Sequence, residues 1–403
     1  MDILLINKFF WKKGGSETVF FGEKELLEEY GHKVIPFAMH GKNNLSSEYS
    51  KYFVNEVDFD DGGLKGKISA ASKIIYSFEA NRNIKKLLVD VDVDVAHFHI
   101  FQHQISPSVF APLKNKNIPL VLTLHDLKPI CPNYKMFTNG EVCEKCKGQK
   151  FYNCLINKCT KGSVIKSLVN VVEMYFHYLM RYYQNVDKYI AVSKFYQRKM
   201  IEFGFPEEQV AYIPNYIDID KFAYSDVDDR YAIYFGRLSE EKGLETLLDA
   251  SKLCPEIPLV IVGSGPQEAE LQSYVKKNAI SNVSFAGFKS GADLTELLSK
   301  ASFSVLPSKW YENCPMSVLE SLAIGKPVIG ADIGGIPELI NHEVDGLIYI
   351  NDDPNDLAAK MQILWQKPEL CIEMGIRGRE KVASDFNKQK HYESLLSVYK
   401  NLI

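Results

Sequence analysis

The chain has 403 residues, which is too long for one ordinary domain and comfortable for two. Hydrophobic residues make up 46% of it and charged residues 24%, the composition of a globular protein with ample core. Because the formal net charge is only −4, nothing in the composition indicates nucleic acid as a partner.

The N-terminal stretch MDILLINKFF is apolar, yet an acid follows Met1 and no small-residue cleavage site comes after it. We therefore interpret it as a first buried strand and not as a signal peptide. No uninterrupted apolar run approaches the ~20 residues of a membrane-spanning helix. The expected location is the cytoplasm, with the inner face of the membrane as a further option.

Short runs rich in Val, Ile and Leu alternate with amphipathic helical stretches along the chain. In the first half, strands are expected at 2–9, 33–39, 95–100, 119–126 and 188–193, and helices at 18–31 and 73–91. In the second half, strands are expected at 231–239, 258–265, 283–288, 303–308 and 327–331, and helices at 243–253 and 269–279. Continuous apolar strands separated by helices predict parallel sheets covered on both faces. Because the pattern breaks near 213–228, we predict two doubly wound α/β domains with a ligand site in the cleft between them.

The loop KKGGSE at 12–17 follows the first expected strand and precedes the first expected helix. Gly14 and Gly15 allow the backbone to approach a phosphate or a sugar closely. Paired glycines also form plain turns, so this signal by itself is modest.

Histidines gather at two later strand ends. His125 ends an apolar strand, where it could hydrogen-bond a sugar hydroxyl or serve as a structural histidine. His97, His99 and His103 alternate near another strand end, and we expect no metal there because alternation splits neighbouring side chains across the sheet. The Asp-x-Asp pattern at 90–95 is interpreted as solvated acids, so no catalytic divalent metal is expected.

Five of the eight cysteines crowd into an insert over 131–160; they are Cys131, Cys143, Cys146, Cys154 and Cys159. The Cys-x-x-Cys step has the spacing of a metal knuckle, and clustered thiols in a cytoplasmic chain indicate zinc more than disulfides. The insert is polar, so its folding would gain little stability without a metal ion or a disulfide to cross-link it. We predict a structural zinc on four of the five thiolates, with disulfides or free thiols as the alternatives.

The next stretch, 163–185, is long, aromatic and lightly basic. It could lie against a membrane that carries a lipid-linked acceptor. The interpretation we favour makes it a domain helix, with its Val, Leu and Met face in the core and its tyrosines along the cleft.

In the second half, Arg237 and Lys242 lie on a loop after a strand, where two cations can neutralise a diphosphate leaving group. A solvated surface loop is the plainer alternative. Further on, Pro315 opens an apolar helix, with Glu312 just before it and Glu320 within it. The free N–H groups at the helix start then form an anion-binding position between two carboxylates. This arrangement suits a nucleotide sugar, which has hydroxyl groups at both ends and negative charge in the middle.

Together these residues make the chain resemble a family-four glycosyltransferase (glycosyl transferases group 1) of the two-domain GT-B architecture, over nearly its whole length. The motifs that carry the resemblance are GGSE at 14–17, HD at 125–126, IPN at 213–215, FGRLSEEKG at 235–243, VGSGP at 262–266, AGF at 286–288 and the Glu312–Glu320 pair. One departure is NCP at 313–315, where many relatives carry a small step such as Gly-Leu-Pro. Cys314 either narrows the sugar pocket or merely supplies a backbone N–H.

The resemblance implies two Rossmann-like domains facing a cleft. The acceptor-side domain would span 1–212 and carry the insert, the nucleotide-sugar domain would span 213–384, and the last helix, 385–403, would pack back on the first domain. The implied activity is a retaining, hexosyltransferase-like transfer of a sugar from a UDP- or GDP-sugar to a hydroxyl acceptor, with a lipid-linked acceptor as one option. Bacterial cell-surface polysaccharide or glycolipid synthesis is the implied setting, and catalysis is expected to need no cofactor.

The resemblance also implies roles for single residues. His125 and Glu312 would contact the donor sugar, and Arg237 and Lys242 would meet the diphosphate. Glu320 would hold the ribose hydroxyls, while the main chain around Phe288 would read the base. The remaining expected donor-binding residues are Gly14, Gly15, Asn215, Gly263, Cys314, Pro315 and Met316.

Two other functions stay open. A nucleotide-sugar epimerase or hydrolase on the same architecture would need a set of catalytic acids that we do not identify. A non-catalytic nucleotide-sugar-binding protein would not need Glu312, Arg237 and Lys242, and all three are present.

Overall fold

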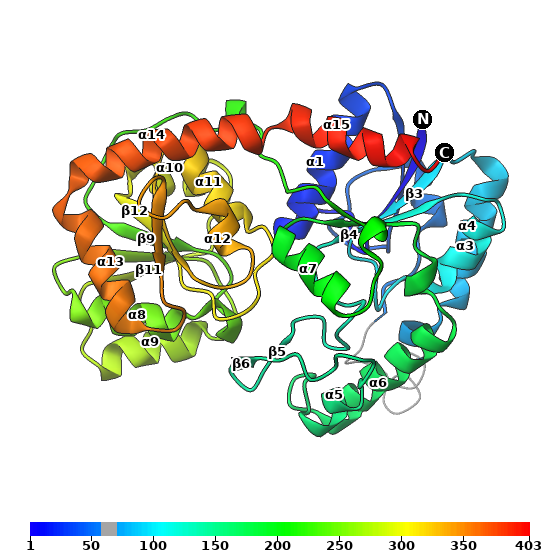
Figure 1. The fold of residues 1–403 in the computed structure, drawn as a ribbon, viewed down its shortest axis with the longest axis horizontal. Coiled ribbons are helices and arrows are strands. Elements are labelled where there is room, and N and C mark those ends of the chain that lie inside the picture. Colours follow the sequence, from blue (N-terminus) through cyan, green and yellow to red (C-terminus); the bar gives the residue numbers. More distant parts are fainter. Residues whose placement is uncertain (58–70) are drawn as a thin grey trace. The chain divides into compact units, whose positions relative to one another are not determined.

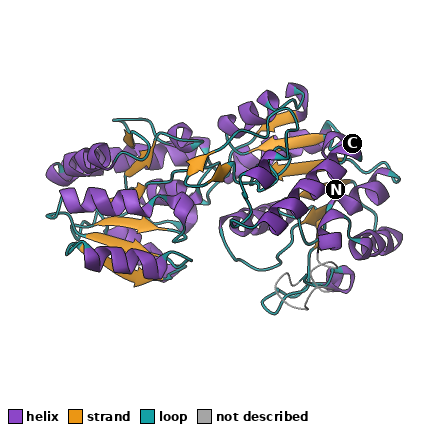
Figure 2. Ribbon diagram, turned by 90° about the horizontal axis from the view of Figure 1, so that it is seen from below, coloured by secondary structure: helices purple, strands orange, loops and turns teal. Residues whose placement is uncertain are grey.

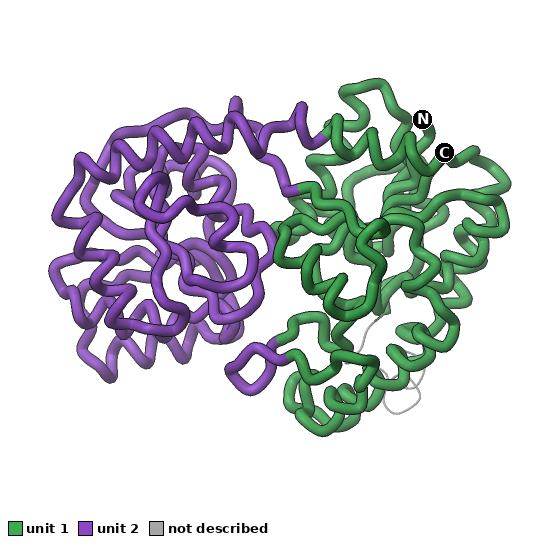
Figure 3. The backbone as a smooth tube through the Cα atoms, viewed as in Figure 1, with its two compact units in different colours: residues 1–136, 144–213, 392–403 green, residues 137–143, 214–391 purple. Residues whose placement is uncertain are grey.

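The computed structural model describes residues 1–57 and 71–403, which divide into two compact units. The N-terminal unit comprises Met1–Met136, Glu144–Ile213 and Tyr392–Ile403 (Figure 3). The C-terminal unit comprises Phe137–Cys143 and Pro214–His391. The end of the chain therefore belongs to the N-terminal unit, whereas a short piece of the Cys-rich insert groups with the C-terminal unit.

The strands described in the N-terminal unit form a parallel sheet in the order β2-β1-β3-β4-β7-β8 (Figure 1). They are β1 (Asp2–Ile6), β2 (Lys33–Phe37), β3 (Val95–Phe98), β4 (Leu120–Leu124), β7 (Lys188–Ala191) and β8 (Val210–Tyr212). Every side chain of β3 and β4 is buried, as expected for a sheet that is covered on both faces. The strand order reverses between β1 and β3, so the loops that follow these strands mark the expected ligand-binding edge.

Helices connect these strands and cover the sheet. They are α1 (Gly15–Glu29), α3 (Phe78–Asp90), α4 (Phe110–Lys114), α6 (Val164–Leu179), α7 (Lys194–Glu202) and, at the end of the chain, α15 (Lys388–Lys400). Serine side chains begin α3, α6 and α7, because Ser77, Ser163 and Ser193 each accept a hydrogen bond from a first-turn N–H. The insert adds the antiparallel hairpin β5 (Phe137–Thr138) and β6 (Glu141–Val142) and the short helix α5 (Asn153–Ile156).

The C-terminal unit repeats this plan, with its described strands in the parallel order β11-β10-β9-β12-β13-β14. They are β9 (Ala232–Phe235), β10 (Leu259–Val262), β11 (Val283–Gly287), β12 (Phe303–Leu306), β13 (Val328–Ala331) and β14 (Gly346–Tyr349). Its helices are α8 (Leu244–Leu253), α9 (Glu268–Lys277), α10 (Ala292–Lys300), α11 (Met316–Ile324), α12 (Ile336–Leu339), α13 (Pro354–Gln366) and α14 (Pro368–Asp385). Figure 2 shows helices on both sides of these strands.

The predicted fold class, two doubly wound parallel α/β domains, is confirmed. Each expected strand is present and is shorter than the apolar run that predicted it. The edge strands β8 and β14 were not expected, because their three and four residues, VAY and GLIY, are too short to stand out in the sequence. The continuous helix expected over 73–91 is interrupted before Phe78, where Ser77 caps α3.

Helix α6 departs from the orientation we favoured. Val171 and Met174 are buried as expected, but Leu168 is 46% and Leu179 is 78% exposed. The other buried residues of α6 are polar: Ser167, Asn170, Glu173 and His177. The predicted core face is therefore confirmed for Val171 and Met174 and wrong for Leu168 and Leu179. Within residues 1–57 and 71–403, no helix is long and apolar enough to cross a membrane.

Candidate functional site

The strand order of the C-terminal sheet reverses between its two central strands, β9 and β12. The loop after β9 carries Arg237 and Lys242, and the loop after β12 carries Glu312. Loops that leave neighbouring parallel strands at their carboxyl ends meet at one edge of the sheet, where folds of this kind bind ligands. Of the predicted residues, Lys242 and Glu312 come into direct contact at this edge.

Lys242 and Glu312 form an ion pair, with 2.5 Å between Nζ and Oε1. Ser308 Oγ donates a hydrogen bond of 2.6 Å to the same carboxylate oxygen. Lys242 Nζ also lies 5.5 Å from the centroid of the Trp310 ring, close enough for a cation–π attraction. The side chains of Glu312 and Lys242 are 5% and 19% exposed, so the pair is largely withdrawn from water yet reachable for a ligand.

Close backbone packing holds the Glu312 loop in place. The Gly335 N–H donates a hydrogen bond of 2.8 Å to the Glu312 carbonyl oxygen. Gly334 has a φ of +62°, and a Cβ there would lie 2.6 Å from the same oxygen, so only glycine fits. At Gly243, just after Lys242, a Cβ would lie 2.0 Å from the Pro307 carbonyl oxygen. The loops that carry the ion pair are thus fixed by glycine contacts on both sides.

Gly263, an expected donor-binding residue, has a packing role in the structure. Its φ is +141°, and a Cβ there would lie 1.9 Å from the carbonyl oxygen of Gly236. This glycine lets the loop after β10 touch the loop after β9. Contact between Gly263 and a donor stays a prediction.

The start of α11 follows Cys314 directly. Pro315 occupies the N-cap and no side chain caps the helix, so N–H groups at Met316 and beyond can meet an anion. The Cys314 carbonyl accepts a hydrogen bond of 2.9 Å from Asn215 Nδ2, which ties the expected IPN motif to the helix start. Burial raises the pKa of the Cys314 thiol to about 12, so the thiol is neutral. Asn215 Oδ1 is buried without a hydrogen-bond partner among the described residues, and so it can accept one from a ligand.

Glu320 lies on α11 with a half-buried side chain. Burial raises the pKa of its carboxyl group to about 7. A carboxylate in such a place gains from hydroxyl groups that donate hydrogen bonds to it, because these favour its ionised form. The position is thus suited to a diol such as ribose.

Arg237 and Phe288 are placed differently from the ion pair. Arg237 is exposed, and its carbonyl oxygen accepts a hydrogen bond of 2.9 Å from Tyr234 Oη. Phe288 follows β11 and is 70% exposed. In the described part of the chain, neither forms an ion pair or a side-chain hydrogen bond with Lys242 or Glu312, so their predicted roles depend on a bound donor.

The glycine loop of the N-terminal unit opens α1. Gly14 is the N-cap, with extended backbone, and Gly15 is the first helical residue. A Cβ on Gly15 would meet nothing within 4 Å, and one on Gly14 would meet only Glu17 Oε2 at 3.7 Å. Neither glycine is required by its own conformation, so the space in front of this helix start is open to a ligand, as the motif predicts.

His125 ends a line of neighbouring side chains that the sequence did not reveal. Its Nε2 lies 2.8 Å from His99 Nδ1, and His99 Nε2 lies 3.2 Å from Glu23 Oε2. Because an ionised Glu23 favours a proton on His99 Nε2, His99 Nδ1 accepts and His125 Nε2 donates. Burial, and then the nearby His99, lower the pKa of His125 to about 3, so the ring is neutral at physiological pH.

The expectation that strand alternation separates the β3 histidines is wrong for His97 and His99. Residues two apart on a strand share a face, and the two ring centroids lie 4.6 Å apart. Ligand atoms of Glu23, His97 and His99 all lie within 4.8 Å of one another, a grouping that could hold a metal ion. However, His97 Nδ1 lies 2.6 Å from Tyr399 Oη and its Nε2 lies 2.8 Å from Thr123 Oγ1. Both ring nitrogens of His97 thus have protein partners.

A second Lys–Glu pair, which the sequence did not predict, lies in the N-terminal unit. Lys128 follows β4, and its Nζ lies 2.7 Å from Glu173 Oε2 of α6, with both side chains 1% exposed. Lys128 also donates a hydrogen bond of 2.9 Å to the Pro132 carbonyl oxygen. Burial alone would raise the pKa of Glu173, but the charges of Lys128 and His103 outweigh it and hold the pKa at about 2.

The five cysteines of the insert are all free thiols. Cys154 and Cys159 share a side-chain hydrogen bond, and this bond, followed by burial, raises the pKa of Cys154. Cys131 and Cys146 also lie near enough to raise the pKa of Cys154. In residues 1–57 and 71–403, Glu23, His97 and His99 form the one group of three or more potential metal ligands whose ligand atoms lie within 4.8 Å of one another. No three thiols of the described insert therefore lie this close together.

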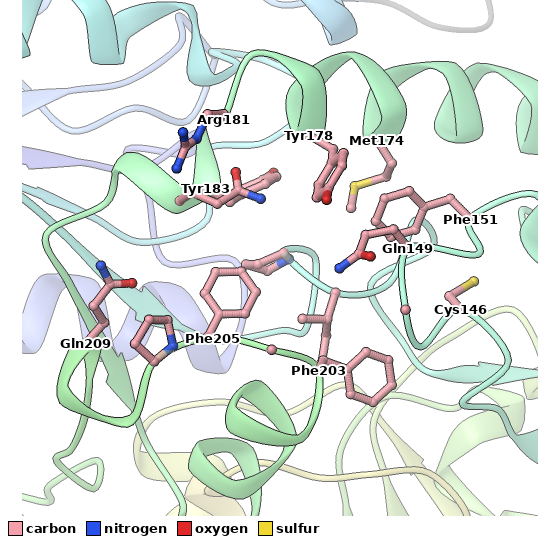
Figure 4. A pocket seen from close by; sticks show the side chains of 16 residues that line it. Cys146, Gln149, Phe151, Met174, Tyr178, Arg181, Tyr183, Phe203, Phe205 and Gln209 are labelled. Carbon is pink, nitrogen blue, oxygen red and sulfur yellow. The ribbon is translucent and has the colours of Figure 1, made fainter.

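A cavity of about 280 Å³ lies between the insert, α6 and the loop that follows α7 (Figure 4). Aromatic side chains such as Phe151 and Phe205 line it together with polar groups of Gln149, Arg181 and Gln209. Of the predicted site residues, Cys146 is on its wall. The volume is at the lower limit of small-molecule pockets, which is small for a whole nucleotide sugar.

Two family models match the chain and together cover most of it. The model for Glycosyltransferase Family 4 matches residues 13–221, and the model for Glycosyl transferases group 1 matches residues 217–381. The two matches meet between β8 and β9, where one parallel sheet ends and the other begins.

Individual proteins of known sequence or structure are similar to the chain. An uncharacterised glycosyltransferase of Methanocaldococcus jannaschii is 26% identical over 403 residues, which cover 100% of this chain and 99% of that protein. The amylovoran biosynthesis glycosyltransferase AmsK of Erwinia amylovora is 28% identical over 227 residues, 53% of this chain and 56% of that protein. The structure of HepE of Anabaena in complex with UDP and glucose has a TM-score of 0.67, with 17% identity over 100% of both chains.

Proposed function

The chain belongs to glycosyltransferase family 4. On that premise we propose that it is a retaining transferase, which moves a hexose from a nucleoside-diphosphate sugar to a hydroxyl acceptor. The nucleotide of the donor is UDP or GDP. The observation that carries this proposal is the Lys242–Glu312 pair at the reversal point of the C-terminal sheet. The pair combines a cation for phosphate with a carboxylate for sugar hydroxyls, and both remain reachable.

The diphosphate lies against Lys242, Arg237 and the start of α11. Departure of the nucleoside diphosphate places negative charge on its terminal oxygens, and preorganised cations and helix N–H groups stabilise that charge. Arg237 is exposed and turns toward the phosphate when the donor binds. No metal ion is needed for this step, because these groups supply the positive charge.

Glu312 orients the transferred sugar through its hydroxyls. Its Oε1 is already fixed by Lys242 and Ser308, so the carboxylate does not have to find its orientation when the donor arrives. Glu320 accepts hydrogen bonds from the ribose hydroxyls, and the backbone beside Phe288 contacts the base. In this arrangement each carboxylate serves one end of the donor.

In the N-terminal unit, we assign His125 and the Gly14–Gly15 loop the donor-binding roles that the resemblance implies. Burial keeps His125 neutral, and the line from Glu23 through His99 places its proton on Nε2, which orients the ring for a donor-sugar hydroxyl. The reacting acceptor is a hydroxyl group of a growing cell-surface polysaccharide or glycolipid; among the similar proteins, AmsK is named for amylovoran biosynthesis. We place this reaction in the cytoplasm, where nucleotide sugars are the activated donors.

A structural zinc on four of the five insert thiols is part of the proposal. The thiols influence one another electrostatically, and the polar insert has few other means of fixing its loops. The ion would close the insert and take no part in the transfer. Metal analysis of the purified protein tests it: about one zinc per chain is expected, and a Cys146→Ser variant should lose it.

The test of the proposed function is release of nucleotide from labelled UDP-, GDP- and ADP-sugars, with and without a lipid extract as a source of acceptors. We expect release with one nucleotide class, product formation with retained anomeric configuration by NMR, and loss of both in Glu312→Ala. Binding of a nucleotide sugar without release or transfer under any condition would instead support a non-catalytic binding protein.

A further inference from the structure

Helix α6 turns apolar residues outward as well as inward. A helix that covers a sheet normally turns its apolar stripe inward and its polar residues to water. In α6 the inward face carries Val171 and Met174 together with the polar residues Ser167, Asn170, Glu173 and His177. The outward face carries a second apolar set, Ile165, Leu168, Val172 and Leu179. The outward residues are spaced by three, four and seven positions, so they form one stripe along the helix.

The polar inward face explains how the protein tolerates this orientation. Glu173 pairs with Lys128, and Asn170 Nδ2 donates a hydrogen bond of 2.9 Å to Thr160 Oγ1. His177 Nε2 lies 2.9 Å from the Ile75 carbonyl oxygen and donates to it. Directed contacts therefore hold α6 to the domain, and its apolar stripe is left facing outward.

Exposed apolar residues also lie on the neighbouring helix. Ile165 is 75% and Leu179 is 78% exposed; in α5, which packs against α6, Ile156 is 68% exposed, and Tyr152 at its N-cap is 47% exposed. In Figure 1 the two helices lie side by side. Exposed apolar residues that are contiguous over two elements mark an interaction surface more often than single exposed residues do.

The charged residues of the insert and α6 are mostly basic. From Lys145 to Arg181 the chain carries seven basic residues and a single acid, Glu173, which is buried. Lys158 and Lys161 precede the N-terminus of α6 and Arg181 follows its C-terminus, and all three are exposed. An apolar stripe with cations at both ends matches the layering of a bilayer interface, in which acyl chains lie beneath anionic headgroups.

We propose that this surface, the α6 face, docks on an anionic lipid bilayer; it comprises Tyr152, Ile156, Ile165, Leu168, Val172 and Leu179 with the flanking Lys158, Lys161 and Arg181. A second copy of the chain is a poorer occupant. A two-fold dimer through this face would bring the cationic ends of α6 against one another without counter-charge. The inference goes beyond the proposed function, because it concerns where the protein sits and holds for any donor or acceptor.

Sedimentation with lipid vesicles tests the proposal, using the full-length protein without donor or acceptor. One vesicle population is phosphatidylcholine alone, and the other contains about one third phosphatidylglycerol. We expect binding to the anionic vesicles, at least tenfold weaker binding for Leu168→Ser/Leu179→Ser, and about fivefold weaker binding for Lys158→Ala. The matched control is Ile372→Ser/Ile376→Ser, which changes two residues of α14 that are 42% and 43% exposed and should bind as wild type does.

The other outcomes contradict the proposal. Wild-type protein that stays in the supernatant with both vesicle types would overturn it, and so would equal losses in the α6 and α14 double variants. Light scattering on a sizing column adds a further check. A wild-type dimer that becomes a monomer in Leu168→Ser/Leu179→Ser would assign the α6 face to a second copy of the chain. None of these results bears on nucleotide release, so the proposed function is tested separately.

Discussion

Each unit holds a Lys–Glu pair beyond the carboxyl edge of its sheet, and the two pairs differ in their access to water. The Lys128–Glu173 pair is 1% exposed on both sides and has further protein partners at Pro132 and His103. The Lys242–Glu312 pair is 19% and 5% exposed and shares Ser308. A pair enclosed by protein contributes to the fold, whereas a reachable pair can exchange contacts with a ligand. The same chemistry thus has a structural use in one unit and a functional one in the other.

The largest effect is expected from Glu312→Ala. This change removes the sugar contact and frees Lys242, whose partial exposure lets water replace the lost partner. Transfer should fall by about 10³-fold or more, while the free energy of unfolding stays within about 1 kcal/mol of wild type. Turnover and denaturant unfolding on the same preparation check this, and near-normal turnover would refute the role of Glu312.

Glu173→Ala should have the opposite signature. It leaves Lys128 buried without its carboxylate, which costs about 3–5 kcal/mol of unfolding free energy. The folded pKa of Glu173 is about 2, below its ordinary value of 4.5, so its stabilisation is present above pH 4.5 and lost as the pH falls toward 2. Denaturant unfolding between pH 7 and pH 3 measures both the loss of unfolding free energy in the variant and its pH dependence in the wild type. Loss of activity at unchanged stability in Glu173→Ala would contradict a structural role for the Lys128–Glu173 pair.

A smaller effect is expected from Glu23→Gln. The amide can donate to His99 Nε2 as well as accept from it, so the tautomer of His125 is no longer fixed. We expect about a tenfold lower kcat with little change in KM for the donor. Glu28→Gln, on the exposed side of α1, is the matched control and should be neutral. An unchanged kcat in Glu23→Gln would separate the histidine line from catalysis.

The smallest effect concerns the pH dependence of Glu320. The pKa of Glu320 in the folded protein is about 7, above the ordinary 4.5, so the folded state holds this proton more tightly than the unfolded state does. As the pH rises from 4.5 to 7, the free energy of unfolding of the wild type should therefore fall relative to that of Glu320→Gln. Ribose hydroxyls favour the ionised form, so nucleotide affinity should rise from pH 6 to pH 8 in the wild type. Melting temperatures with and without nucleotide over this range provide the measurement. A flat pH profile in both proteins would contradict the assignment.

The sequence predicts the functional pair better than the structural one, for a physical reason. Lys242 and Glu312 each follow an apolar strand within a motif of the resembled family, which predicts a donor-binding role for both although not their contact. Lys128 and Glu173 belong to no such motif, so only the folded chain reveals their contact. The contact between Glu23, in the middle of α1, and His99 is likewise revealed only by the folded chain.

Helix α6 shows a second limit of sequence reasoning. Its periodicity correctly predicts a helix with an apolar stripe, but periodicity cannot tell which face turns inward. The general preference for an apolar core holds for Val171 and Met174 but fails for Leu168 and Leu179, because Lys128 and Thr160 provide partners that let polar residues of α6 be buried instead.

The most direct test of the central claim is a thermal-shift measurement with UDP, GDP and ADP on the wild type and on Glu320→Gln. A nucleotide at ~100 times its dissociation constant adds about 2.7 kcal/mol, enough for a shift of several degrees in domains of this size. We expect such a shift of the melting temperature with one nucleotide in the wild type and a smaller shift in Glu320→Gln. No shift with any nucleotide would contradict a donor site in the C-terminal unit.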